Sequence, residues 1–157
     1  MNMKQETIKT TAKKPVVSIP FVITLIGALL LIASFFLPLA SATGKYREYL
    51  QKYPEELYAE EINMTNGEAM DISLLEFDKM YAAAAKLGLY KDTAIACMVI
   101  ISIFGLFALL ITLFTALRKP AVIIVLSLLS LGVFQLIMWD FEDRGVLPSN
   151  NFGYGIA

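Results

Sequence analysis

Histidine is absent from this 157-residue chain, and cysteine and tryptophan occur only once each. The chain therefore lacks the side chain that titrates nearest to neutral pH and most often serves as a catalytic base or metal ligand. A single cysteine, Cys97, excludes an intrachain disulfide and is best interpreted as a small apolar packing residue. No calcium-loop spacing, phosphate-binding glycine loop or nucleophile elbow occurs. We expect no enzymatic activity, no cofactor, no metal and no nucleic-acid partner.

Charge is also missing from three long stretches, residues 15–44, 93–117 and 120–139. About 20 apolar residues in a helix cross the ~30 Å hydrocarbon core of a bilayer, and each stretch is long enough. The composition agrees, with 57% hydrophobic and 17% charged residues. The sequence predicts an all-α integral membrane protein, with the lipid bilayer as its main surroundings and three transmembrane helices at residues 16–43, 93–117 and 120–139.

The charges outside these stretches predict the orientation of the helices. Lys and Arg close to a membrane span are retained in the cytoplasm. The segment at residues 1–15 is basic, and residues 118–119 are Arg and Lys. Residues 44–92 carry ten acidic against six basic residues, and residues 140–157 begin with an acidic segment. We expect a multi-pass protein of the cell membrane with its amino terminus and the 118–119 turn in the cytoplasm and both acidic segments outside.

Both ends of this arrangement leave an alternative open. Ala40-Ser41-Ala42 also fits the small-residue cleavage site of a secretory signal peptide, so the first stretch could be removed before Thr43. Its apolar run exceeds the usual signal core of up to about 15 residues, which favours retention as an anchor. At the other end, residues 149–151 could cap another helix that begins at Phe152. The three spans would then be the first three of a four-helix bundle.

Small residues in the second and third spans predict where these helices meet. In lipid, helices associate through close packing and interhelical hydrogen bonds, and small side chains allow that approach. The short 118–119 connection and Pro120, which suits the first helical position, predict an antiparallel hairpin. The helix-packing residues that we expect at its interface are Ser102, Gly105, Ala108, Ser127, Ser130 and Gly132.

The outer segment at residues 44–92 is long enough for structure of its own, and we expect a mainly helical extracytoplasmic loop. Tyrosines recur at helical spacing after residue 45, and Pro54 with two following glutamates is typical of a helix start. Asn66-Gly67 favours a turn, so a short hairpin around it is an alternative. Ser73 and Glu76 have the spacing of a capping box, and Gly88 is suited to end the helix that begins there.

Exposed aromatic and leucine side chains in this loop are typical of protein interfaces. The predicted contact residues are Tyr46, Tyr49, Tyr53, Leu57 and Tyr58. We interpret the chain as a non-enzymatic interaction or accessory component of the cell envelope, whose partner is another membrane protein or a second copy of the chain. The alternative is a subunit of a transporter or channel. That alternative is disfavoured because charged groups within a span usually mark transport pathways and these spans contain none.

The chain combines three features: a lysine-bearing start, a long outer loop, and a first span that ends in Phe36-Leu37-Pro38-Leu39-Ala40-Ser41-Ala42. In this arrangement the chain resembles uncharacterised small multispanning membrane proteins of Gram-positive bacteria. That resemblance implies no activity and transfers no functional residue. The loop placement also resembles the claudin plan, but Cys97 and Trp139 leave no place for that family's loop tryptophan and cysteine pair, so we reject this relationship.

The predicted orientation places Lys52 outside the cell and Lys119 inside it. A membrane-impermeant amine reagent applied to intact cells is therefore expected to modify Lys52 and to leave Lys119 unmodified, as measured by peptide mass mapping. Permeabilised cells are the control, because both lysines are then accessible. Modification of Lys119 in intact cells would contradict the orientation.

Overall fold

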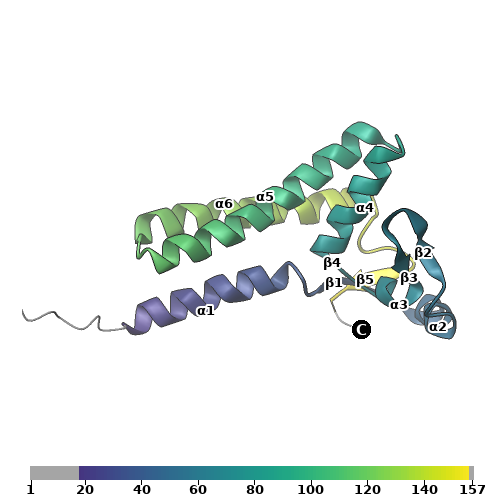
Figure 1. Cartoon of the computed structure of the whole chain (residues 1–157), viewed down its shortest axis with the longest axis horizontal. Helices are drawn as coiled ribbons and strands as arrows, with labels where there is room; N and C mark the ends of the chain where they lie inside the picture. The colour runs from purple at the N-terminus through teal and green to yellow at the C-terminus, as the bar shows by residue number, and fades with distance from the viewer. Residues whose placement is uncertain (1–17, 156–157) are drawn as a thin grey trace, which may run out of the picture.

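The structure is a computed structural model that describes residues 18–155, and helices dominate it. Three helices, α1 (Ile19–Ser34), α5 (Lys91–Ala116) and α6 (Pro120–Asp143), extend from one end of a smaller α/β unit (Figure 1). Both α5 and α6 are long and apolar enough to cross a membrane. The membrane prediction is therefore confirmed in coarse form, as a mostly helical chain with two candidate membrane-spanning helices. The shorter α1 rises only about 24 Å over its length.

The two long helices form the predicted antiparallel hairpin. Pro120 occupies the first turn of α6, where its missing N–H leaves no helix bond unmade. In the turn, Arg118 has a left-handed backbone and the Lys119 amide donates to the Phe114 carbonyl at 3.0 Å. Within residues 18–155, Arg118 and Lys119 are the only charged residues at this end of the hairpin, because the helical stretches on either side of them carry no charge.

A three-stranded sheet joins segments that are far apart in the sequence. Strand β1 (Pro38–Ala42) is central and pairs antiparallel with β4 (Asp71–Ser73) on one side and β5 (Phe152–Tyr154) on the other. Ala40 lies opposite Ile72 and Tyr154, and its side chain is fully buried. The sheet therefore fixes the end of the first apolar stretch against residues 71–73 and 152–154.

This sheet corrects the prediction that residues 16–43 form one transmembrane helix, because α1 ends at Ser34 and residues 38–42 are a strand. Pro38 has no N–H with which to continue the helix, and β1 satisfies its backbone through two neighbouring strands instead. The all-α class is likewise corrected to mainly helical with small sheets. Cleavage before Thr43, the signal-peptide alternative, would remove the central strand of this sheet.

The carboxyl-terminal prediction is also corrected. Residues 152–154 form β5 and are not the opening turn of a fourth span, because they hydrogen-bond along the free edge of β1. Helix α6 continues to Asp143, past the predicted end at residue 139, since an acidic residue does not itself stop a helix. The prediction of a cytoplasmic tail at residues 1–15 lies outside the described residues.

The rest of the α/β unit comprises six short elements: α2 (Gly44–Lys52), β2 (Leu57–Ala59), a 3₁₀ turn (Glu60–Ile62), β3 (Met64–Thr65), α3 (Asn66–Ala69) and α4 (Leu74–Lys86). The capping box that starts α4 is confirmed, since the Ser73 amide donates to Glu76 at 2.6 Å and the Ser73 hydroxyl accepts from the Glu76 amide at 3.3 Å. The prediction of a helix that starts at Pro54 is wrong, because strand β2 follows Pro54 and pairs with β3.

The proposed hairpin turn at Asn66-Gly67 is wrong as well. These residues open α3, and Thr65 with Glu68 forms a second capping box, which was not predicted. The three-residue spacing of Thr65 and Glu68 is typical of a capping box, but the strong turn preference of Asn-Gly favoured the hairpin prediction.

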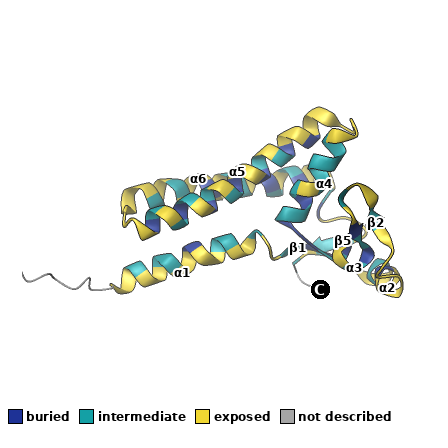
Figure 2. Ribbon diagram, in the orientation of Figure 1, coloured by how far each residue is buried: buried dark blue, intermediate teal, exposed yellow. Residues whose placement is uncertain are grey.

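The hydrophobic core lies where α4, α5, α6 and the sheet meet, as the dark blue segments of Figure 2 show. The rings of Phe77 on α4 and Phe141 on α6 have centroids 4.9 Å apart. Leu147, which follows α6, is fully buried in the same cluster. The core therefore holds the long helices to the α/β unit, whereas the other ends of these helices expose most of their apolar side chains.

Replacing Phe141 with alanine is expected to lower the free energy of unfolding by about 3–5 kcal/mol, because it leaves a cavity in this core. Thermal melting of the detergent-solubilised protein measures the effect. Leu129→Ala is the matched control, since Leu129 is exposed on the same helix. Equal melting temperatures for the two variants would contradict the assignment of the core.

Candidate functional site: an aromatic surface and a lateral groove

The α/β unit presents three of the five predicted contact residues on its surface. Tyr49, Tyr53 and Leu57 are 50%, 39% and 50% exposed, respectively. The Tyr49 and Tyr53 rings have centroids 5.6 Å apart, and the Lys52 ammonium lies 5.2 Å from the centre of the Tyr53 ring. We call Tyr49, Tyr53 and Leu57 the outer aromatic surface. Its members come from α2, the turn after it and the first residue of β2.

The other two predicted contact residues, Tyr46 and Tyr58, are only partly exposed. Tyr46 packs edge-on against Phe152 of β5, with 5.5 Å between ring centroids. Burial, and to a smaller extent the neighbouring Tyr46, raise the pKa of Tyr58 to about 12. Tyr58 is therefore a neutral phenol at physiological pH. These two residues support the unit more than they extend the exposed surface.

An ion pair holds α2, and with it the outer aromatic surface, against the sheet. Arg47 of α2 binds both carboxylate oxygens of Asp71 on β4, at 3.1 and 3.3 Å. The Ser41 hydroxyl on β1 lies 2.5 Å from Asp71 and also reaches the Gly155 carbonyl. The hydrogen bond from the Arg47 guanidinium holds the pKa of Asp71 below its usual range. Partial burial raises this pKa, and the hydrogen bond from Ser41 lowers it.

A second set of hydrogen bonds fixes the turn that carries Tyr53. The buried Asn66 amide donates to the Tyr53 carbonyl at 2.9 Å, and the Gly67 amide donates to the Pro54 carbonyl at 2.9 Å. A Cβ added at Gly67 would lie 3.3 Å from that carbonyl, so glycine suits this close approach. Asn66-Gly67 therefore supports a neighbouring turn instead of forming one.

The predicted helix-packing residues occupy different environments. Ala108 and Ser130 are buried. Gly105 faces α1, because a Cβ there would lie 3.2 Å from the Phe35 ring, and this closeness lets Phe35 stack on Phe104. The exposed Ser102 hydroxyl donates to Asp78 of α4 at 3.3 Å. A Cβ added at Gly132 would have no atom of the described residues within 4 Å.

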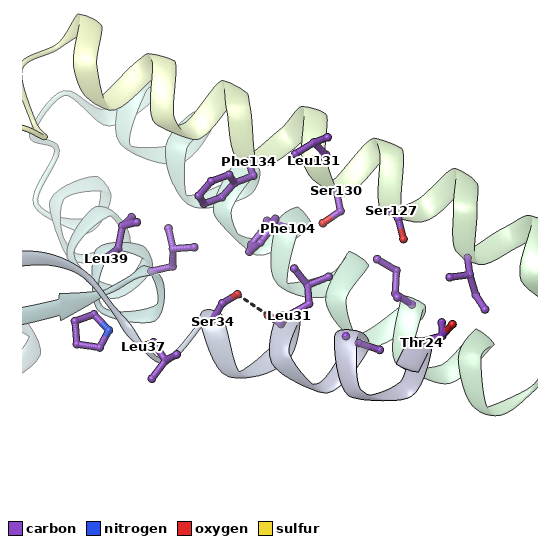
Figure 3. A pocket seen from close by; sticks show the side chains of 16 residues that line it. Thr24, Leu31, Ser34, Leu37, Leu39, Phe104, Ser127, Ser130, Leu131 and Phe134 are labelled. Atoms are coloured by element: carbon purple, nitrogen blue, oxygen red, sulfur yellow. Dashed lines mark hydrogen bonds between the residues drawn. The ribbon is translucent and has the colours of Figure 1, made fainter. Parts of the chain in front are cut away.

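Ser127 and Ser130 border a lateral groove between α1 and α6, with α5 as its floor (Figure 3). Its volume is about 750 Å³. Figure 3 shows both serine hydroxyls pointing from α6 toward α1. Ser130 is 3% exposed, and its hydroxyl has no hydrogen-bond partner within residues 18–155. The sequence marked these serines as helix contacts, whereas the structure places them on the wall of an open space.

A polar cluster at the end of the hairpin that adjoins the α/β unit was missed by sequence reasoning. Arg144 donates to the Tyr81 hydroxyl and the Cys97 sulfur, each at 3.1 Å, and pairs with Asp140. These residues belong to α4, α5 and the end of α6. The cavity beside Cys97 measures only about 10 Å³, about the size of one water, and the cluster joins three helices.

Within residues 18–155 no group of three His, Cys, Asp or Glu side chains has the placement of a metal site. No protein-family model, curated protein or solved structure matches this chain. The class of the protein is therefore defined by its own fold: a mainly helical chain with a candidate membrane hairpin and an α/β unit at one end.

The lowered pKa of Asp71 predicts an acid-sensitive α/β unit. A carboxylate with a lowered folded-state pKa contributes stability above its unfolded pKa of about 3.9, and this contribution is lost as the pH falls through the folded value. Melting temperatures of the detergent-solubilised protein between about pH 6 and pH 3 are expected to fall less steeply for Asp71→Asn than for the wild type.

Glu60→Gln, which removes an exposed carboxylate from the same unit, is the matched control. An unchanged pH dependence in Asp71→Asn would show that the Arg47 pair is unimportant for the unit.

Proposed function

We propose that this chain is a non-enzymatic, multi-pass protein of the cell membrane that contacts another membrane protein through its outer aromatic surface. In this proposal α1, α5 and α6 all lie in the bilayer. The α/β unit lies outside the cell, and residues 118–119 and the amino terminus lie in the cytoplasm. The observation that carries the proposal is the rigid presentation of Tyr49, Tyr53 and Leu57 on a unit built at one end of three apolar helices.

The arrangement of charge supports this orientation. The sheet gathers residues 38–42, 71–73 and 152–154 at one end of the helices, so both acidic segments share that end. Arg118 and Lys119 lie at the opposite end of the hairpin, where the positive-inside rule places the cytoplasm. Trp139, which is exposed on α6 one residue before Asp140, is suited to the interface between lipid and water.

The surfaces of α1, α5 and α6 support lipid as their solvent. Each helix exposes large aliphatic side chains along its length, for example Leu30 on α1, Leu109 on α5 and Leu128 on α6. A soluble monomer rarely exposes a continuous apolar surface of this extent. Helix α1 is short for a span, but the exposed Phe36 and Leu37 extend its apolar surface beyond Ser34.

The chemistry of the outer aromatic surface supports a protein partner. Tyrosine is enriched in the centre of interfaces because it combines a large apolar ring with a polar hydroxyl and has few rotatable bonds. Exposed residues of both signs neighbour this surface in the sequence, with Glu48, Glu55 and Glu56 on one side of the balance and Lys52 on the other. A partner with an apolar contact area and a polar border would therefore match it best.

The contact is tested by placing a photo-crosslinking amino acid at Tyr49 or Tyr53 in the full chain in native membranes. We expect one discrete adduct, heavier than the chain and identifiable by mass spectrometry, because these side chains lie at the interface. Tyr90 is the matched control, since it is an aromatic residue that is 88% exposed but lies at the α4–α5 turn. It is expected to yield no such adduct.

An adduct of two copies of the chain would contradict a foreign partner in favour of self-association. The absence of any adduct from positions 49 and 53, or equal adducts from all three positions, would contradict the proposed surface.

A further inference from the structure

Along the helix axes, the lateral groove between α1 and α6 is about as long as one leaflet of a bilayer is thick. Its lining on α6 runs from Ile123 to Phe134, which a rise of 1.5 Å per residue separates by about 16 Å. This is roughly half of the ~30 Å hydrocarbon core. At its outer end the groove is lined by Leu39 of strand β1 and Leu74 of α4. An occupant therefore enters from the side or from the inner end, and reaches only about halfway across.

The walls of the groove suit a hydrocarbon chain. Gly27 and Ala28 on α1 and the serines of α6 leave space between the helices, and Leu31 and Phe104 add apolar surface. The Thr24 and Ser34 hydroxyls donate to carbonyls of their own helix, at 2.8 and 2.7 Å. The lining contains no charged side chain. A charged or strongly polar ligand would lose its hydration here, with only the Ser127 and Ser130 hydroxyls to replace it.

A cation stands at the inner mouth of the groove. A second cavity, of about 270 Å³, shares Thr24 and Ile123 with the groove and continues it to Arg118. The Arg118 guanidinium carbon lies 4.9 Å from the centre of the Phe21 ring at the start of α1. Arg118 is exposed and is followed by Lys119, so positive charge collects where the groove reaches the predicted cytoplasmic surface.

We infer that the groove binds one acyl chain of an anionic phospholipid of the cytoplasmic leaflet, with the lipid phosphate at Arg118. This inference rests on the proposed orientation. A guanidinium forms bidentate hydrogen bonds with phosphate, and basic pockets between transmembrane helices on the cytoplasmic side are suited to anionic headgroups. A transmembrane helix fits less well, because it needs the whole thickness of the bilayer and brings no anion to Arg118.

Native mass spectrometry tests this site. The full-length protein is reconstituted with equal amounts of phosphatidylglycerol and phosphatidylcholine, extracted in a mild detergent and progressively delipidated. We expect one phosphatidylglycerol per chain to remain, in about fivefold excess over phosphatidylcholine. Arg118→Gln should reduce that excess to near one. Lys91→Gln, which removes a cation from the opposite end of α5, should preserve it.

Variants that fill the groove separate chain binding from headgroup binding. Ser127→Phe should reduce the retention of both lipids, whereas Leu128→Phe, on an exposed side of the same helix, should not. Gly27→Val on α1 is the second groove variant, used if Ser127→Phe loses its thermal transition. No atom lies within 4 Å of a Cβ at Gly27, so this substitution fits the fold.

Three results would overturn the lipid site: equal retention of the two lipids by the wild type, a phosphatidylglycerol excess that survives Arg118→Gln, or a lipid-free dimer that Ser127→Phe dissociates. A chain that remains monodisperse without detergent would instead contradict the proposed membrane insertion. A detergent-dependent chain without a preference for phosphatidylglycerol would contradict the lipid site alone.

Discussion

Strand β1 hydrogen-bonds on both of its edges, and the positions of all the long helices depend on this pairing. It follows α1 after only three residues, so the end of α1 is fixed by the sheet. Through β4 the same strand fixes the start of α4, and through β5 it fixes the segment that leaves α6. Buried backbone amides and carbonyls must find partners, and here the partners come from segments 30 to more than 100 residues away.

This constraint connects the two features to which we assign a role. On one side of the sheet, the ion pair between Arg47 and Asp71 holds α2, and so positions Tyr49 and Tyr53 at the surface. Leu37, Pro38 and Leu39, at the start of β1, line the end of the lateral groove that adjoins the sheet. The groove remains open because α1 packs on α5 and leaves α6 at a distance, with Gly105 accommodating the Phe35 ring. One strand thus shapes both an outward surface and a space within the helices.

The success of sequence reasoning followed the range of the interactions involved. The hairpin of α5 and α6 and the capping box at Ser73 and Glu76 were predictable because they depend on residues close together in the chain. The strand at residues 38–42 was not, since its apolar and small side chains read equally well as the end of a span. Asn66-Gly67 was misread because its local turn preference was overruled by the Thr65 cap and by contacts to Tyr53 and Pro54.

The candidate sites divide in the same way. The tyrosine spacing in residues 46–53 identified a surface, but only burial against Phe152 separated Tyr46 from the exposed Tyr49. The sequence by itself determined the apolar helices, their hairpin and the placement of charge, because hydrophobicity and charge act on each segment independently. The tertiary structure alone decided the sheet, the polar cluster around Arg144 and the groove lined by Ser127 and Ser130. Each of these features requires contact between segments that are distant in the chain. Composition and residue spacing do not indicate which distant segments come into contact.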